Sequence, residues 1–142
     1  MAMLLCTIIL AICFNCGLGE ADPAVSPDEL TLYFASSRPD GLGGSDLWMM
    51  TRATKHDSWS EPMNLGPMVN SPWGDWCPRP SADGLSLYFH SNRAGGEGDN
   101  DIWMTTRISL DAPWQAATNL GPRINTGASD MNPSISSDGL TL

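Results

Sequence analysis

Apolar and polar residues alternate in short runs along this chain, a pattern typical of β-strands with one side against a core. In residues 85–91 we expect Leu87 and Phe89 on one face of a strand. Tyr88 and His90 then lie on the opposite face. Glycine, proline and aspartate separate the runs, and after position 20 no window of ten residues shows the apolar period of a helix. The pattern predicts an all-β protein.

The sequence contains a tandem repeat that aligns with itself without a gap. Residues 15–69 and 70–124 are identical at 23 of 55 positions, and a third copy begins at Asn125. Each copy predicts four strands, which in the second copy cover approximately 75–81, 85–91, 101–107 and 114–119. Units of this size cannot bury an apolar face alone and must stack on neighbours. Four strands in each copy favour propeller blades over the coils of a β-helix, whose period would be shorter.

The second copy carries the motif P-x-x-S-x-D-G-L-x-L-Y-F-x-S-N-R-x-G-G-x-G-x-x-D-I-W between Pro78 and Trp103. This motif resembles the WD-like repeat of TolB-type β-propellers, and the resemblance extends from about Asn15 to Leu142. It implies tandem four-stranded antiparallel blades. The first copy departs from the motif at Glu29 and Ser37.

The repeat divides the chain into a first blade at about 20–74, a second at about 75–129 and the start of a third at 130–142. Propellers of the TolB type are expected to have about six blades. We therefore expect an incomplete propeller, and a fragment of a longer protein.

An apolar segment precedes the repeats. Residues 3–14 are uncharged, but they are fewer than the about 20 that a membrane-spanning helix needs. Their length fits the apolar region of a secretory signal peptide, and small residues follow at Gly17, Gly19 and Ala21. Residues 1–19 are therefore predicted as a signal segment, with the protein in the periplasm, in the cell envelope or secreted. The alternatives are a misassigned start and a buried apolar strand.

Charge and cysteine content exclude several classes of protein. The net charge of −9 lacks the basic surface that phosphate binding requires, so nucleic acid is not an expected partner. Three of the four cysteines lie at Cys6, Cys13 and Cys16 in the apolar segment, which leaves Cys77 alone in the repeats. A disulfide scaffold is therefore not expected there.

The glycine-rich loop of the second copy has two interpretations. Asp99, Asn100 and Asp101 offer oxygen ligands that suit a calcium ion. The other interpretation, which we favour, is a wide hairpin loop in which Asp101 and its counterpart Asp46 accept hydrogen bonds from nearby backbone amides.

Charged residues recur once per copy, which favours structural roles over a single active site. The pairs Arg38 with Asp46 and Arg93 with Asp101 are predicted to hold one hairpin each, with the guanidinium bound to loop carbonyls or to the aspartate. A further aspartate is predicted to cap its own turn in each copy, at positions Asp28, Asp83 and Asp138.

The aromatic residues fall into two groups. Trp103 and Trp114 have counterparts at Trp48 and Trp59 and are predicted to pack between sheets. Residues found in one copy alone are better candidates for binding a peptide or a sugar ring. These candidates are Trp73, Asp75, Trp76 and His90, and for the two tryptophans packing inside the protein is the interpretation that we favour.

No motif for nucleophilic catalysis, for a metal triad or for phosphate binding is present in the sequence, and no cofactor is expected. We expect a non-catalytic binding or scaffolding module that recognises protein or peptide partners through loops on one face. The alternative is the propeller portion of a serine peptidase or a glycosidase, with catalytic residues outside this chain.

Overall fold

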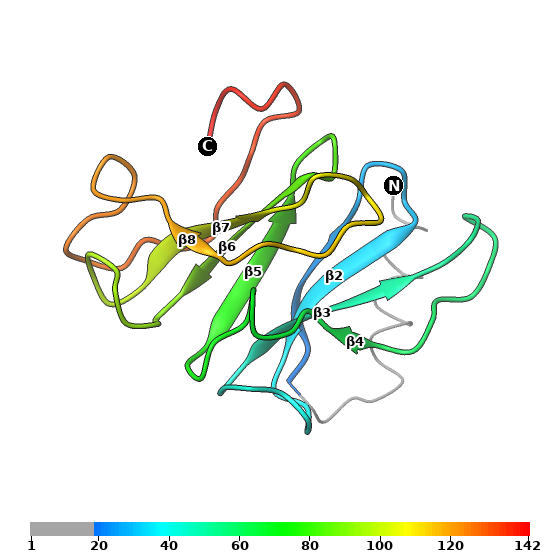
Figure 1. Cartoon of the computed structure of the whole chain (residues 1–142), viewed down its shortest axis with the longest axis horizontal. Coiled ribbons are helices and arrows are strands. Elements are labelled where there is room, and N and C mark those ends of the chain that lie inside the picture. Colours follow the sequence, from blue (N-terminus) through cyan, green and yellow to red (C-terminus); the bar gives the residue numbers. More distant parts are fainter. Residues whose placement is uncertain (1–18) are drawn as a thin grey trace.

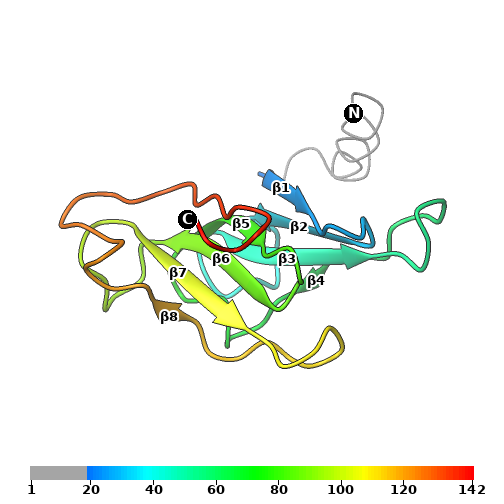
Figure 2. The same ribbon diagram turned by 90° about the horizontal axis from the view of Figure 1, so that it is seen from above.

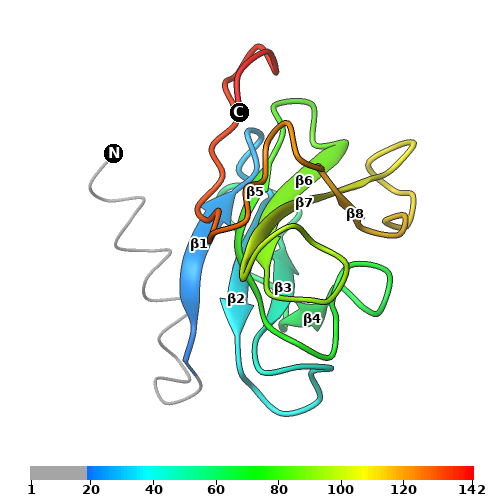
Figure 3. The same ribbon diagram turned by 90° about the vertical axis from the view of Figure 1, so that its left-hand side faces the viewer.

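The computed structural model describes residues 19–142, and the predicted signal segment falls almost entirely outside this range. The described part is all β and forms two four-stranded antiparallel sheets. The first sheet contains β1 (Ala21–Val25), β2 (Thr31–Ser36), β3 (Asp46–Thr51) and β4 (Met63–Asn64) in this order, which can be followed in Figure 3. The second contains β5 (Asp75–Pro80), β6 (Ser86–Ser91), β7 (Asp101–Thr106) and β8 (Thr118–Asn119). The predicted tandem blades are confirmed.

The two sheets pack against each other, with β5 beside the first three strands of the first sheet (Figure 1). Both meanders have the same register, since Phe34 pairs with Trp48 and the equivalent Phe89 pairs with Trp103. The fourth strand is shorter than predicted. It begins only at Thr118, because the backbone between Trp114 and Thr118 is irregular.

The core between the blades follows the predicted alternation. Leu87, Phe89 and Trp103 of the second sheet pack against Tyr33 and Leu47 of the first. Trp114 closes the outer end of this core, where its ring makes an edge contact with the Tyr33 ring at 6.4 Å between centroids. Each sheet therefore buries one face against its neighbour, as stacked blades must.

The first strand of each blade contains a β-bulge. The register shifts by one residue between Ala21 and Ala24 in β1 and between Trp76 and Arg79 in β5. Asp22 and Cys77 lie in these bulges with φ of 54° and 57°. Their counterpart in the third copy, Asn132, has φ of 58°. A left-handed backbone conformation therefore recurs at this position in all three copies.

The segment after β8 returns to the second sheet (Figure 2). The Asn132 amide carbonyl accepts a hydrogen bond from the Cys77 thiol, and its backbone N–H donates to Nδ1 of His90. Residues 133–142 form no strand, but the turn predicted at Asp138 is present, where the carboxylate accepts from Ser136 and from the backbone of Leu140.

Candidate functional site

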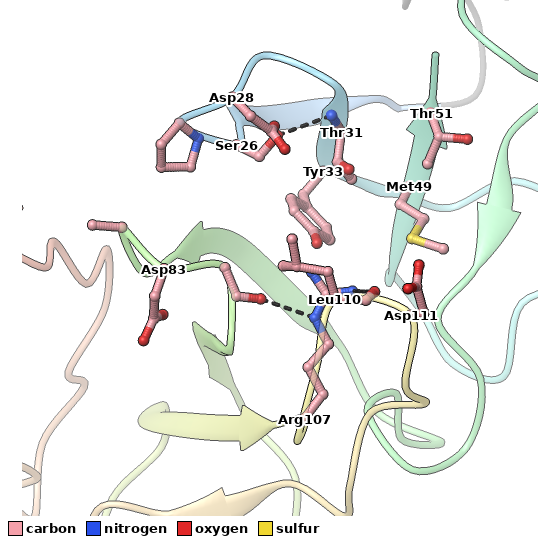
Figure 4. A pocket seen from close by; sticks show the side chains of 13 residues that line it. Ser26, Asp28, Thr31, Tyr33, Met49, Thr51, Asp83, Arg107, Leu110 and Asp111 are labelled. Carbon is pink, nitrogen blue, oxygen red and sulfur yellow. Dashed lines mark hydrogen bonds between the residues drawn. The ribbon is translucent and has the colours of Figure 1, made fainter. Parts of the chain in front are cut away.

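A cleft of about 410 Å³ opens between the two blades, on the side of the molecule where β1 turns into β2 and β5 turns into β6. Figure 4 shows Tyr33 in the centre of this cleft, with Asp28, Asp83 and Asp111 around it. Both blades contribute to its walls, so its shape depends on how the sheets pack. Concave sites of this volume with mixed apolar and polar walls are typical of ligand binding.

The two turns that border the cleft are built in the same way. In the first turn, a carboxylate oxygen of Asp28 accepts from the Ser26 hydroxyl and from the backbone N–H of Leu30. These hydrogen bonds lower the pKa of Asp28 below its usual value. Each turn uses one oxygen of its aspartate internally, because a capped turn needs one acceptor.

In the second turn, Asp83 accepts from Ser81 and from Leu85, and its pKa is lowered for the same reason. The Asp83 side chain is exposed, and Figure 4 shows its carboxylate pointing away from Tyr33 and Leu110.

Arg107 is the cation that lines the cleft. Its guanidinium lies over the Trp114 ring at 4.4 Å from the centroid. It also donates to the backbone carbonyls of Gly84 and Leu110. The positive group is thereby fixed to the second blade and joins the turn before β6 to the loop after β7.

The apolar part of the cleft comes from Tyr33, Met49 and Leu110. Burial raises the pKa of the Tyr33 hydroxyl, which stays neutral at physiological pH. Leu110 is 54% exposed, so a hydrophobic side chain at the rim is open to solvent.

The predicted pairing of Arg93 with Asp101 is wrong. Arg93 forms its ion pair with Asp75, a fully buried carboxylate at the start of β5. Asp101 instead accepts hydrogen bonds from the backbone N–H groups of Glu97 and Gly98, as the hairpin interpretation predicted. The backbone N–H groups of a wide loop need an acceptor, which a carboxylate provides and a guanidinium cannot.

In the first blade, Arg38 likewise pairs with Glu20 and not with Asp46. Asp46 accepts from the amides of Leu42 and Gly43. Glu20 and Asp75 occupy equivalent positions of the two copies, so the ion pair itself belongs to the repeat.

The prediction that Asp75 contacts a ligand is wrong, because its carboxylate is engaged by Arg93 and Ser71 inside the protein. His90 is also buried and stacks on Trp76 at 5.5 Å between ring centroids. Trp73 is 47% exposed and stays a candidate for contact with a partner. These residues do not line the cleft between the blades.

The calcium ligands proposed for the glycine loop are only partly available. The Asp101 carboxylate is buried against its own loop, and Asn100 donates to the Ser129 hydroxyl at 3.4 Å. Asp99 is exposed. Within residues 19–142, no group of three His, Cys, Asp or Glu side chains is placed to hold a metal ion.

Sequence reasoning missed the cleft, because it is formed by turns from different copies. One local signal was available. Lys55 and His56 follow β3, whereas Leu110 and Asp111 occupy the equivalent positions after β7. The two basic residues of the first copy are replaced by an apolar and an acidic residue, so the chemistry of this loop is specific to the second blade.

Comparison with known proteins bears on the fold. No family model matches the chain. No curated protein sequence matches it either. Residues 19–142 also contain no helix of the length and apolarity needed to cross a membrane.

Among solved structures, the chain is similar to a protein assigned as TolB from Agrobacterium tumefaciens, with 21% sequence identity and a TM-score of 0.52. The match covers 84% of this chain and 39% of the Agrobacterium chain. The chain therefore has the fold of consecutive blades of a TolB-like β-propeller.

Proposed function

We propose that this protein is a non-catalytic binding module that recognises a protein or peptide segment in the cleft between its two blades. The cleft carries the proposal, because it combines apolar surface at Met49 and Leu110 with polar groups from both blades. Extended peptides present alternating side chains and backbone groups, and such mixed walls suit both.

The network around the cleft supports a preformed site. Arg107 is held by two backbone carbonyls and by the Trp114 ring, so one wall needs no rearrangement on binding. Rigid walls reduce the entropy lost when a flexible peptide binds. The repeated ion pairs stiffen each blade and lie away from the cleft.

The apolar N-terminal segment and the TolB-like fold support a place in the cell envelope or outside the cell, and this location is part of the proposal. A protein in this location would meet its partners after export.

Selection from a random library of 12-residue peptides displayed on phage tests the proposed function. The bait is the 142-residue chain. The variant Ala82→Trp is designed to block the cleft, because Ala82 is an exposed residue that lines it. We expect enriched peptides with micromolar affinity that bind the unchanged chain and lose at least tenfold in affinity for Ala82→Trp. Enrichment of no peptide, or equal binding to both chains, would contradict the proposal.

A further inference from the structure

We infer that the cleft selects a lysine or arginine side chain of an extended peptide, an inference that rests on the proposed function. Three carboxylates at the rim come from separate segments, at Asp28, Asp83 and Asp111. Arg107 is the one cation among the residues that line the cleft. The cleft therefore carries an excess of negative charge, in a protein whose net charge is −9.

The existing cation does not neutralise this rim. The Arg107 guanidinium donates to Gly84 and Leu110, both through backbone carbonyls, and rests on Trp114. The Asp111 side chain is exposed and makes no hydrogen bond or ion pair with other residues in the range 19–142. Asp83 uses one carboxylate oxygen in its own turn, and its exposed side chain forms no ion pair with another residue in the range 19–142.

In the first blade, a lysine of the chain itself lies near the turn that borders the cleft. Lys55 follows β3, and its ammonium lies 3.2 Å from the carboxylate of Glu29 in the neighbouring turn. The pKa of Asp28 is lowered mainly by its hydrogen bond from Ser26, and the charge of Lys55 lowers it further. In the second blade the equivalents of Lys55 and Glu29 are Leu110 and Gly84, so this blade has neither the lysine nor the carboxylate that it binds.

The floor of the cleft suits the stem of a long basic side chain. Met49 and Leu110 offer apolar surface below the acidic rim, above the buried Tyr33. Lysine and arginine bury their methylene groups along such surface and keep the charged end among polar groups. The apolar surface of Met49 and Leu110 and the carboxylates at the rim therefore match both parts of one residue.

Titration of the ¹⁵N-labelled 142-residue chain, followed by NMR, tests the inference with three probes. These are acetyl-Ala-Lys-Ala-amide, its glutamine analogue and butylamine. We expect the lysine peptide to shift resonances of cleft residues and to bind at least fivefold more tightly than either other probe. Raising the salt concentration from 50 to 300 mM should weaken its binding at least twofold, because charge attraction is screened.

The variant for this test is Asp111→Asn, because the Asp111 side chain is exposed and supports no other residue in the described part of the chain. Asp99→Asn is the matched control, since Asp99 is an exposed aspartate of the glycine loop that does not line the cleft. We expect Asp111→Asn to weaken lysine-peptide binding at least threefold and Asp99→Asn to leave it unchanged.

Equal binding of the lysine and glutamine peptides, both blocked by Ala82→Trp, would overturn the inference while the proposed function stands. Binding of butylamine as tight as that of the peptide would show a site for free amines and would also overturn it. An equal effect of Asp99→Asn and Asp111→Asn would show attraction by overall charge alone and would overturn it as well. Failure of the phage selection as well as of the titration would remove the proposed function itself.

Discussion

The guanidinium of Arg93 and the carboxylate of Asp75 form an ion pair across the base of the second blade, and the copy of this pair in the first blade joins Arg38 to Glu20. Asp75 is fully buried, and the Arg93 side chain is 11% exposed. Arg93 also donates to the carbonyl of Val69 in the segment that links the two blades. Arg93 therefore fixes β5 to the β6–β7 loop and to the connection between the two blades.

Loss of the Arg93 charge is expected to destabilise the fold. Arg93→Met keeps an apolar stem over Phe89 and Trp103 but leaves Asp75 buried without a counter-charge. We expect a loss of about 3 kcal/mol in the free energy of unfolding, measured with urea. Arg79→Met is the control, because among residues 19–142 the Arg79 guanidinium bonds only to the neighbouring carbonyl of Pro78. A loss below about 1 kcal/mol for Arg93→Met would contradict the role given to the pair.

Two adjacent glycines should respond differently to alanine. A Cβ at Gly43 would lie 1.7 Å from the carbonyl oxygen of Trp73, whereas a Cβ at Gly44 would have no atom within 4 Å. We expect Gly43→Ala to cost about 2 kcal/mol, since the hairpin loop must move away from the blade connection. Gly44→Ala should change stability by less than about 0.5 kcal/mol. Thermal unfolding of both variants checks this, and equal midpoints would refute the close approach.

Asn70, in the connection between the two blades, is expected to contribute strongly to the stability of the fold. The Asn70 side chain accepts from the backbone N–H of Leu47 and donates to the Leu47 carbonyl, all within the core. Asn70→Ala leaves the buried N–H of Leu47 unpaired, while the Leu47 carbonyl still accepts from the backbone N–H of Leu65, so we expect a loss of about 2 kcal/mol by urea unfolding. Asn100→Ala, which removes one exposed contact to Ser129, should cost less than about 0.5 kcal/mol. Similar losses for the two variants would exclude the proposed role of Asn70.

Stability should fall in mildly acidic solution because of His90. Burial lowers the pKa of His90 in the folded protein below its ordinary value of 6.5. Between the folded and unfolded pKa values the unfolded chain binds more protons, so stability is complete above the unfolded pKa and is lost as the pH falls toward the folded pKa. The lowered pKa values of Asp28, Asp83 and Asp138 act only below about pH 4 and do not overlap with this window.

Urea unfolding between pH 5 and 8 measures this dependence. We expect the unfolding midpoint of the unchanged chain to drop as the pH is lowered from about 7 to 5. In His90→Gln the drop should be clearly smaller. Parallel curves for the two proteins would assign the dependence to other groups.

The blades were predictable because the strand alternation and the tandem repeat can both be read directly from the sequence. The alternation of Tyr88 and Phe89 indicated which side chain faces the neighbouring blade. The capped turns at Asp28 and Asp83 were predictable for the same reason, since a serine and an aspartate two residues apart determine the bonds.

Contacts between distant segments were not predictable in this way. Recurrence indicated that Arg93 and Asp101 were structural, but spacing alone did not select Asp75 as the partner of Arg93. The bulge at Cys77 shifts the alternation in β5 by one residue, and a non-glycine residue with positive φ carries no signal in one sequence. The cleft depends on the angle between the sheets, which the pattern of a single blade does not contain.

Asp22, Cys77 and Asn132 share a left-handed backbone conformation at one position of the repeat, and at Asp22 and Cys77 this residue forms a strand bulge, which has a consequence for the geometry of any longer array. Each bulge bends the first strand of its blade at the same point, so curvature is encoded in the backbone of the repeat itself. Every additional unit of this kind would contribute the same rotation, and the number of units needed to close a circle would then be an inherited property of the repeating unit, independent of the lengths of surface loops.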